Sequence, residues 1–213
     1  NRFLGIDLTN EGLMNVFDDT SINRSNGVHS NSGVITVNTA STLTVTGAGM
    51  VTFTNETNGR IEGSGTINLA NTDVFVNNGT FAPDDGGETA TLTIIGDWNQ
   101  SALGALEIDI FGSGARGLSN DLLDITLDAT LDGLLVVSTF GNVNPSDSFV
   151  VLEALNYTGL FSNTAGGTVA TTNGGQFDVI YNGATVTLTN FVPTPGSMSL
   201  LGIAMLAGLR RKR

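Results

Sequence analysis

Residues 34–54 read VITVNTASTLTVTGAGMVTFT, and apolar side chains alternate there with Thr in short runs. A period of two is the period of a β-strand, because successive side chains point to opposite faces of a sheet. Gly and Asn separate the runs, and both accept the positive φ angles of tight turns. The stretch therefore predicts short strands joined by tight corners. Its core-facing residues are expected to be Leu43, Val45, Val51 and Phe53.

The same alternation extends on both sides of this stretch, and no long amphipathic helix pattern occurs in the first 190 residues. The body is therefore predicted to be all-β. The spacing of the turn signals fits a sandwich, a barrel or a solenoid. Short strands and corner amides that can stack into ladders favour the solenoid, a parallel β-helix, although no fixed repeat length emerges. These amides are Asn38, Asn55, Asn58, Asn68, Asn71, Asn77 and Asn78.

At about residue 78 the pattern changes to longer strands and larger aliphatic blocks, such as residues 91–98 and 130–137. Two last strands, residues 177–181 and 184–189, are expected to pair through Asn182-Gly183, because this dipeptide fits a two-residue hairpin.

Several segments of this second half follow one another in a distinctive order. They are Asn78 to Pro83, Leu92 to Asp97, Leu106 to Ile110, Ser119 to Leu123, Ala129 to Gly133 and Thr158 to Phe161. Over residues 78–189 they resemble the C-terminal part of autotransporter-passenger-like β-solenoid modules in bacterial surface proteins. The resemblance implies a parallel β-helix that ends in a β cap. We therefore expect solenoid rungs in residues 1–77, continued upstream of residue 1, and the solenoid end with its cap in residues 78–190.

The C-terminal tail, residues 191–213, consists of three segments in succession. The sequence Val192-Pro193-Thr194-Pro195 enforces an extended spacer. An apolar segment follows that can form a short hydrophobic helix, below the roughly 17–25 residues of a membrane span. A basic cluster ends the chain. The apolar residues are Leu200, Leu201, Ile203, Met205, Leu206 and Leu209, and the cluster is Arg210, Arg211, Lys212 and Arg213.

This tail resembles the PEP-CTERM sorting tails of Gram-negative and related bacteria, with Thr194 in place of the Glu of the family motif. The resemblance implies export, recognition by an exosortase-type membrane protease, and retention of the tail at the membrane. A core helix with a charged end is the alternative, and the apolar character all round the segment disfavours it. The N-terminal residues show no apolar signal-peptide core, so we expect a mature or truncated chain.

Charge and composition exclude several function classes. Twenty acidic residues oppose eight basic ones, and four of the basic ones are the last four residues, which argues against nucleic-acid binding. The absence of Cys excludes a disulfide framework, a thiolate metal site and a cysteine nucleophile. Hydrophobic residues make up 40% of the chain, enough to bury a core.

Few residues suggest chemistry, and no catalytic residue is assigned. Glu107 and Asp109 share one face of a strand at a spacing that glycosidases use, but outward acids that solvate a sheet explain them better. His29 is expected on the surface, and Arg60 is expected to be isolated. Trp98 is the candidate for contact with a sugar ring, although partial burial at a strand end is the stronger expectation.

Two other features could bind a ligand. Asp121, Asp124, Asp128 and Asp132, or Asp84-Asp85-Gly86-Gly87, could supply oxygen ligands to Ca²⁺. Both lack the spacing of known calcium loops, so solvated strand ends explain them better and no metal ligand is assigned. An outward ladder of hydroxyls could meet a polysaccharide, and ordinary solvent-facing Thr explains it equally well. Its members are Thr36, Thr44, Thr46, Thr52 and Thr54.

The sequence predicts a non-enzymatic, exported structural protein of the cell surface or extracellular matrix of a Gram-negative-type bacterium. Its expected partners are an exosortase-type sorting protease, the membrane through the tail, and exopolysaccharide. An adhesin or carbohydrate-binding module is the first alternative, to be tested by glycan binding that Trp98→Ala abolishes. A polysaccharide-active enzyme of the lyase type is the second, and the scarcity of candidate bases argues against it.

Overall fold

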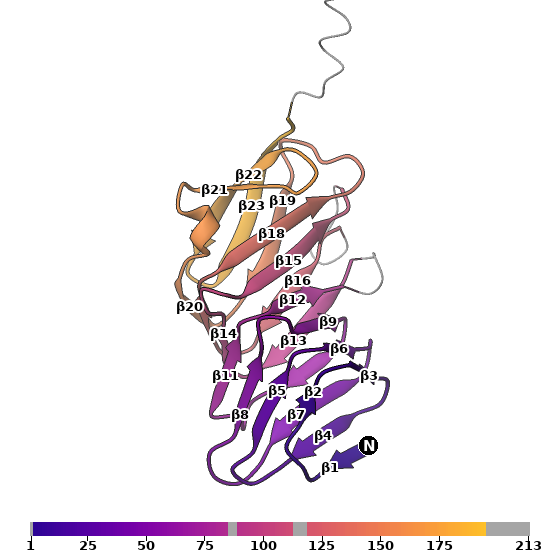
Figure 1. Ribbon diagram of the computed structural model, residues 1–213. Helices are drawn as coiled ribbons and strands as arrows, with labels where there is room; N and C mark the ends of the chain where they lie inside the picture. The colour runs from indigo at the N-terminus through magenta and orange to yellow at the C-terminus, as the bar shows by residue number, and fades with distance from the viewer. Residues whose placement is uncertain (1, 85–88, 113–118, 195–213) are drawn as a thin grey trace, which may run out of the picture.

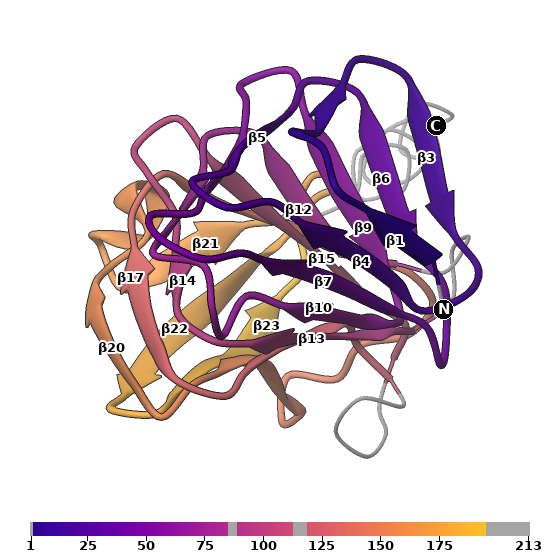
Figure 2. The same cartoon turned by 90° about the horizontal axis from the view of Figure 1, so that it is seen from below.

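The computed structural model describes residues 2–84, 89–112 and 119–194. In this part of the chain the backbone winds into a stack of coils, and the strands of successive coils pair in parallel (Figure 1). Seen along the stack, the coils enclose a common interior (Figure 2). The prediction of an all-β chain with stacked parallel strands is therefore confirmed.

Four sheets form the walls of the solenoid. Sheet A consists of β1 (Arg2–Leu4), β4 (Thr20–Asn23), β7 (Thr42–Thr46), β10 (Thr66–Asn68), β13 (Thr91–Ile95), β16 (Leu122–Ile125) and β19 (Ser148–Glu153), followed by β23 (Thr185–Val192), β22 (Gln176–Asn182) and β21 (Thr168–Ala170). Sheet B consists of β2 (Thr9–Asn10), β5 (Val28–Asn31), β8 (Thr52–Asn55) and β11 (Val74–Asn77).

The other two sheets complete the coils. Sheet C consists of β3 (Leu13–Val16), β6 (Val34–Val37), β9 (Arg60–Gly63), β12 (Thr80–Pro83), β15 (Ala105–Ile110) and β18 (Leu134–Thr139). Sheet D consists of β14 (Trp98–Asn99), β17 (Asp128–Leu131) and β20 (Asn156–Gly159), and it continues the wall of sheet B through a bridge from Asn77 to Gln100. A short 3₁₀ helix, η1 (Ser162–Thr164), follows β20.

Side chains of equivalent position stack in columns inside the solenoid. In sheet C one column consists of Met14, Ile35, Ile61, Phe81, Leu106 and Leu135. All of these are fully buried except Met14, which lies partly buried in the first coil. The four predicted core residues of the 34–54 stretch, Leu43, Val45, Val51 and Phe53, are each 0% exposed, so that prediction is confirmed. Burial of these columns is the main source of stability.

Two strands expected to be continuous are in fact divided by corners. Residues 91–98 form β13 and β14, with a break at Gly96, whose φ is 128°. Residues 130–137 belong to β17 and β18, with a break at Gly133, whose φ is 63°. A side chain at Gly133 would also collide with the backbone oxygen of Gly104 in the preceding coil. Glycine is required at these corners because the coils approach closely there.

An antiparallel hairpin closes the C-terminal end of the stack. β22 and β23 pair through the Asn182-Gly183 turn, as predicted, and β23 pairs in antiparallel fashion with β19, the last parallel strand of sheet A. Phe177 packs between Phe149 and Phe191, at centroid distances of 5.9 and 4.8 Å. β23 continues to Val192, so the first two residues of the predicted tail, Phe191 and Val192, lie in the last strand of the sheet.

The hairpin is fastened to the last coil by a tyrosine. The Tyr181 hydroxyl accepts a hydrogen bond from the Phe161 backbone N–H (3.1 Å) and lies 2.7 Å from the Thr164 hydroxyl. Tyr181→Phe removes both interactions while the ring remains, so we expect the free energy of unfolding to fall by ~1–2 kcal/mol. Urea unfolding followed by far-UV circular dichroism measures this. An unchanged midpoint would show that η1 is not held through this hydroxyl.

Candidate functional site

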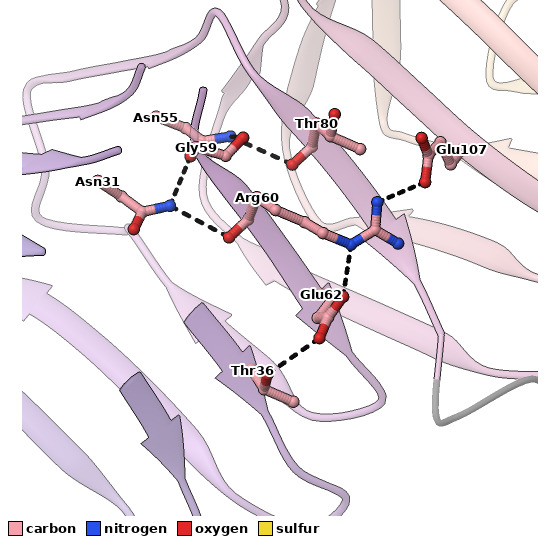
Figure 3. Close-up of polar contacts among 8 residues, drawn as sticks. All are labelled: Asn31, Thr36, Asn55, Gly59, Arg60, Glu62, Thr80 and Glu107. Atoms are coloured by element: carbon pink, nitrogen blue, oxygen red, sulfur yellow. Dashed lines mark hydrogen bonds and ion pairs between the residues drawn. The ribbon is translucent and has the colours of Figure 1, made fainter. Parts of the chain in front are cut away.

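Glu107 and Asp109 of β15 lie on the outer face of sheet C, and the guanidinium group of Arg60 contacts the carboxylate of Glu107 (Figure 3). Arg60 Nη1 is 2.5 Å from Glu107 Oε2, and Arg60 Nε is 2.5 Å from Glu62 Oε2. Glu62 Oε1 in turn accepts a hydrogen bond from the Thr36 hydroxyl at 3.1 Å. Arg60 therefore spans from β9 to β15, across β12. The expectation of an isolated Arg60 is wrong, because its partner Glu107 lies 47 residues away in the sequence.

This arrangement does not resemble a pair of catalytic carboxyl groups. The carboxylate of Glu107 is neutralised by Arg60, whereas glycosidases need both carboxyl groups open to the substrate. Burial, with the nearby charges of Asp84 and Glu107, raises the pKa of Asp109 above its ordinary value. The geometry is that of a polar brace between coils.

A second set of polar side chains runs through the interior of the solenoid. We call Asn10, Asn31, Asn55, Asn77 and Gln100 the amide ladder. The Nδ2 group of each Asn donates to the side-chain oxygen of the next member, at 2.7 Å for the first three bonds and 3.2 Å for the last. Gln100 Nε2 ends the ladder by donating to the backbone oxygens of Asp132 and Leu134. Ladder members are 21 to 24 residues apart along the chain.

The ladder also crosses the expected boundary between residues 77 and 78. Asn77 bonds to Gln100, so the coils on the two sides are continuous. What changes at this point is the coil length, because equivalent residues in the later coils are 28 to 31 positions apart. The change of pattern that the sequence shows at residue 78 therefore marks larger coils.

A sequence signal for the ladder exists and was missed. Each amide from Asn31 onward follows an aromatic side chain by two positions, in His29-Ser30-Asn31, Phe53-Thr54-Asn55, Phe75-Val76-Asn77 and Trp98-Asn99-Gln100. The aromatic residues stack in the same wall, with Phe53 and Phe75 5.7 Å apart. An aromatic-x-amide repeat with a variable interval therefore predicts which residues of each coil point inward at this wall. The variable interval hid it from a search for a fixed repeat.

His29, predicted on the surface, and Trp98, predicted to be partly buried, both belong to this aromatic wall. His29 is 1% exposed, so its expected surface position is wrong. Its Nδ1 accepts a hydrogen bond from the Leu8 N–H at 3.0 Å, and burial lowers its pKa. Trp98 is also 1% exposed and packs edge-on against Phe81 at 6.0 Å. A sugar contact at Trp98 is therefore wrong, because the indole is enclosed in the core.

The candidate calcium ligands lie apart from one another. Asp121 points inward, Asp124 lies on sheet A, Asp128 bonds to Asn156 beside sheet D, and Asp132 bonds to the Gly133 N–H at a corner. Within residues 2–84, 89–112 and 119–194, no group of three acidic or His side chains is placed to hold a metal ion. Of the other stretch, residues 85–87 lie outside the described residues.

The outer face of sheet A carries polar side chains in register, most of them with hydroxyl groups. Thr42, Thr66 and Thr93 share one position in successive strands, and Ser21, Thr44 and Asn68 share another. At the N-terminal end of this face lies a cavity of about 210 Å³. Its lining residues are Phe3, Asp19, Thr20, Ser21, Thr42 and Thr44. Of the predicted hydroxyl ladder, Thr44 and Thr46 lie on this sheet, whereas Thr36 belongs to sheet C and Thr52 and Thr54 to sheet B.

The predicted sorting motif begins at the end of the hairpin. Val192 is the last residue of β23, and it lines a cavity of about 390 Å³ together with Pro193, Thr194, Ala170, Gly175 and Gln176. Pro195, the apolar segment and the basic cluster lie outside the described residues, as does the expected hydrophobic helix. Among the residues that the structure describes, no helix has the length and apolar character to cross a membrane.

The solenoid was compared with known proteins. No protein-family model, no curated protein and no solved structure matches the chain. The resemblances to PEP-CTERM tails and to autotransporter-passenger modules therefore depend on the sequence motifs alone.

Proposed function

We propose that this chain is a non-enzymatic structural protein of a bacterial cell surface or extracellular matrix, exported and sorted by its PEP-CTERM-like tail, and associated with exopolysaccharide. The proposal depends on the order in which the solenoid, the hairpin and the tail motif follow one another along the chain. A stack of parallel coils ends in an antiparallel hairpin, and the Pro-Thr-Pro motif follows the last strand of that hairpin directly.

The stack is suited to a mechanical role. Parallel strands bond each coil to the next, and the amide ladder adds side-chain bonds inside the same stack. The brace around Arg60 adds ion pairs on the outside. A rod built in this way resists bending, because deformation must break bonds in several walls at once.

The hairpin and the charge favour separate rods over aggregates. β22 and β23 cover the end of the parallel sheet, which would otherwise present unpaired backbone groups to another chain. A net charge of −12 makes rods repel one another. Both properties fit a protein that stands outside the cell at high local density.

The intact mass of the protein recovered from the envelope and the medium of its own host tests this proposal. We expect a C-terminus close to Thr194, because an exosortase-type protease would remove the apolar segment and the basic cluster. Replacing Arg210, Arg211, Lys212 and Arg213 together by Ser should leave the tail uncleaved and the body away from its normal location. Recovery of the natural chain with Arg213 still present would contradict sorting by cleavage.

A further inference from the structure

We propose that the cavity at the N-terminal end of sheet A, which we call the Phe3 cavity, is a subsite for one sugar ring of a neutral polysaccharide. This inference rests on the proposed association with exopolysaccharide and names the class of polymer and the place of contact. It moves the sugar contact from the buried Trp98 to an open face of the solenoid.

Phe3 is the aromatic residue among those that line the Phe3 cavity. Phe3 is in register with Ser21 of β4 and points to the outer face, where its side chain is 73% exposed. The residues in register with it on this face are Ser21 and Thr44, so Phe3 is the apolar member of a row of small polar side chains. Its apolar surface borders the Phe3 cavity of about 210 Å³.

The rest of the lining supplies the polar partners that a sugar requires. Ser21, Thr42 and Thr44 each carry a hydroxyl that can donate and accept hydrogen bonds. The carboxylate of Asp19 is held in place because its Oδ1 accepts the Thr42 N–H at 3.0 Å. One aromatic plane beside fixed hydroxyls and one carboxylate suits a pyranose, which has an apolar C–H face and a rim of hydroxyl groups.

Charge selects a neutral polymer over one rich in uronic acids. Among the described residues that line the Phe3 cavity, Asp19 is charged and none is basic. Arg2, which precedes Phe3 in β1, is paired with Asp18 at 3.6 Å. A uronate carboxylate would therefore meet Asp19 without a compensating cation. The net charge of −12 adds long-range repulsion.

The rows of polar side chains continue from the Phe3 cavity along the outer face of sheet A. From the Phe3 cavity, Thr44 leads to Asn68 and Thr42 leads to Thr66 and Thr93, all in adjacent strands of one sheet. Neighbouring strands are about 4.8 Å apart, so the rows present polar groups at a regular interval along the solenoid. A polymer anchored by one ring at Phe3 can continue over this surface. This makes a chain of sugars a better ligand than a single sugar.

The test measures binding of the full chain, kept soluble in mild detergent, to immobilised neutral hexose polymers, to a uronate polymer and to the host exopolysaccharide. We expect retention on a neutral polymer and a loss of affinity of about tenfold for Phe3→Ala, the equivalent of one aromatic contact. Phe17→Ala is the matched control, because Phe17 is 69% exposed and does not line the Phe3 cavity. It should bind as the natural chain does.

A second variant tests the charge argument. Asp19→Asn keeps an oxygen that can accept the Thr42 N–H and removes the negative charge, so binding to the uronate polymer should increase relative to the natural chain. Both variants alter exposed positions, and their thermal unfolding midpoints should match that of the natural chain, which separates loss of the site from loss of the fold.

The outcomes are distinguishable. Equal affinity of the natural chain and Phe3→Ala for a bound polymer would overturn the subsite and leave the association with exopolysaccharide intact. Preference of the natural chain for the uronate polymer would overturn the assignment to a neutral ligand. Failure to bind any of the three polymers would overturn both this inference and the association with exopolysaccharide, whereas sorting by the tail is decided by the mass measurement.

Discussion

Replacing Asn55 by Ala is expected to lower the free energy of unfolding by ~3–4 kcal/mol. Asn55 is 0% exposed and lies in the middle of the amide ladder. Its side chain accepts a hydrogen bond from Asn31 and donates to Asn77, Gly59 and Thr80. Ala would leave these groups buried without partners and would break the ladder between two coils. The cost of unpaired polar groups in the interior is larger than the net gain of the bonds themselves.

The effect is measured by urea unfolding followed by far-UV circular dichroism. Asn58→Ala is the control, since Asn58 lies on an exposed turn three residues away, and its unfolding free energy should change by less than about 0.5 kcal/mol. A loss below about 1 kcal/mol for Asn55→Ala would mean that water or backbone movement replaces the missing amide. The ladder would then be a consequence of the stacking and not a support for it.

A buried carboxyl group should make the protein less stable as the pH rises. Asp121 is 2% exposed, and its two oxygens accept the N–H groups of Ala90 and Asp109 at 2.9 Å each. Burial, assisted by the charges of Asp109 and Asp84, raises the pKa of Asp121 to about 8, against the two hydrogen bonds that favour its ionised form. The folded protein therefore keeps a proton that the unfolded chain releases near pH 4.

It follows that the stabilising contribution of this proton is fully present below the ordinary pKa of Asp and is lost as the pH rises toward 8. Between pH 5 and pH 9 we expect the free energy of unfolding to fall by roughly 2–5 kcal/mol. Asp121→Asn should remove most of this dependence, at the cost of one hydrogen bond at every pH. Urea unfolding across this pH range measures both.

Asp124→Asn serves as the control for the pH experiment. It removes a carboxyl group three residues away, from the outer face of sheet A. It should therefore keep the pH dependence of the natural chain, apart from a small change in overall repulsion. Equal pH dependence of Asp121→Asn and the natural chain would show that other carboxyl groups, or net charge alone, control the response.

Local alternation was enough to predict the strands and the side chains that fill the core. In β7 each inward residue is apolar and each outward residue is Thr, so hydropathy alone assigns the faces. The Asn182-Gly183 hairpin was equally accessible, because a two-residue turn depends on the conformational preferences of the turn itself. The charge balance, which argues against nucleic acid, needed composition only.

Alternation failed where the interior is polar. His29 and Asn31 point inward in β5 while Val28 is 66% exposed, the reverse of what hydropathy assigns. Their place follows from stacking on Phe53 and Asn55, which the local pattern of β5 does not contain. Trp98 is buried further along the same wall, two positions before the ladder member Gln100. A search for the aromatic-x-amide repeat at a variable interval would have placed all of them.

The sequence by itself determined the strand pattern, the core faces, the hairpin and the three-part tail, because each depends on residues close together in the chain. Only the tertiary structure decided the register of the coils, and with it the amide ladder, the Arg60 brace and the Phe3 cavity. Residues paired in successive coils are 18 positions apart at Arg2 and Thr20, 27 at Thr66 and Thr93, and 31 at Thr91 and Leu122, so the interval along the chain does not give the partner in space. Register is set by which side chains fit on those of the previous coil, and that fit exists only when the coils are stacked.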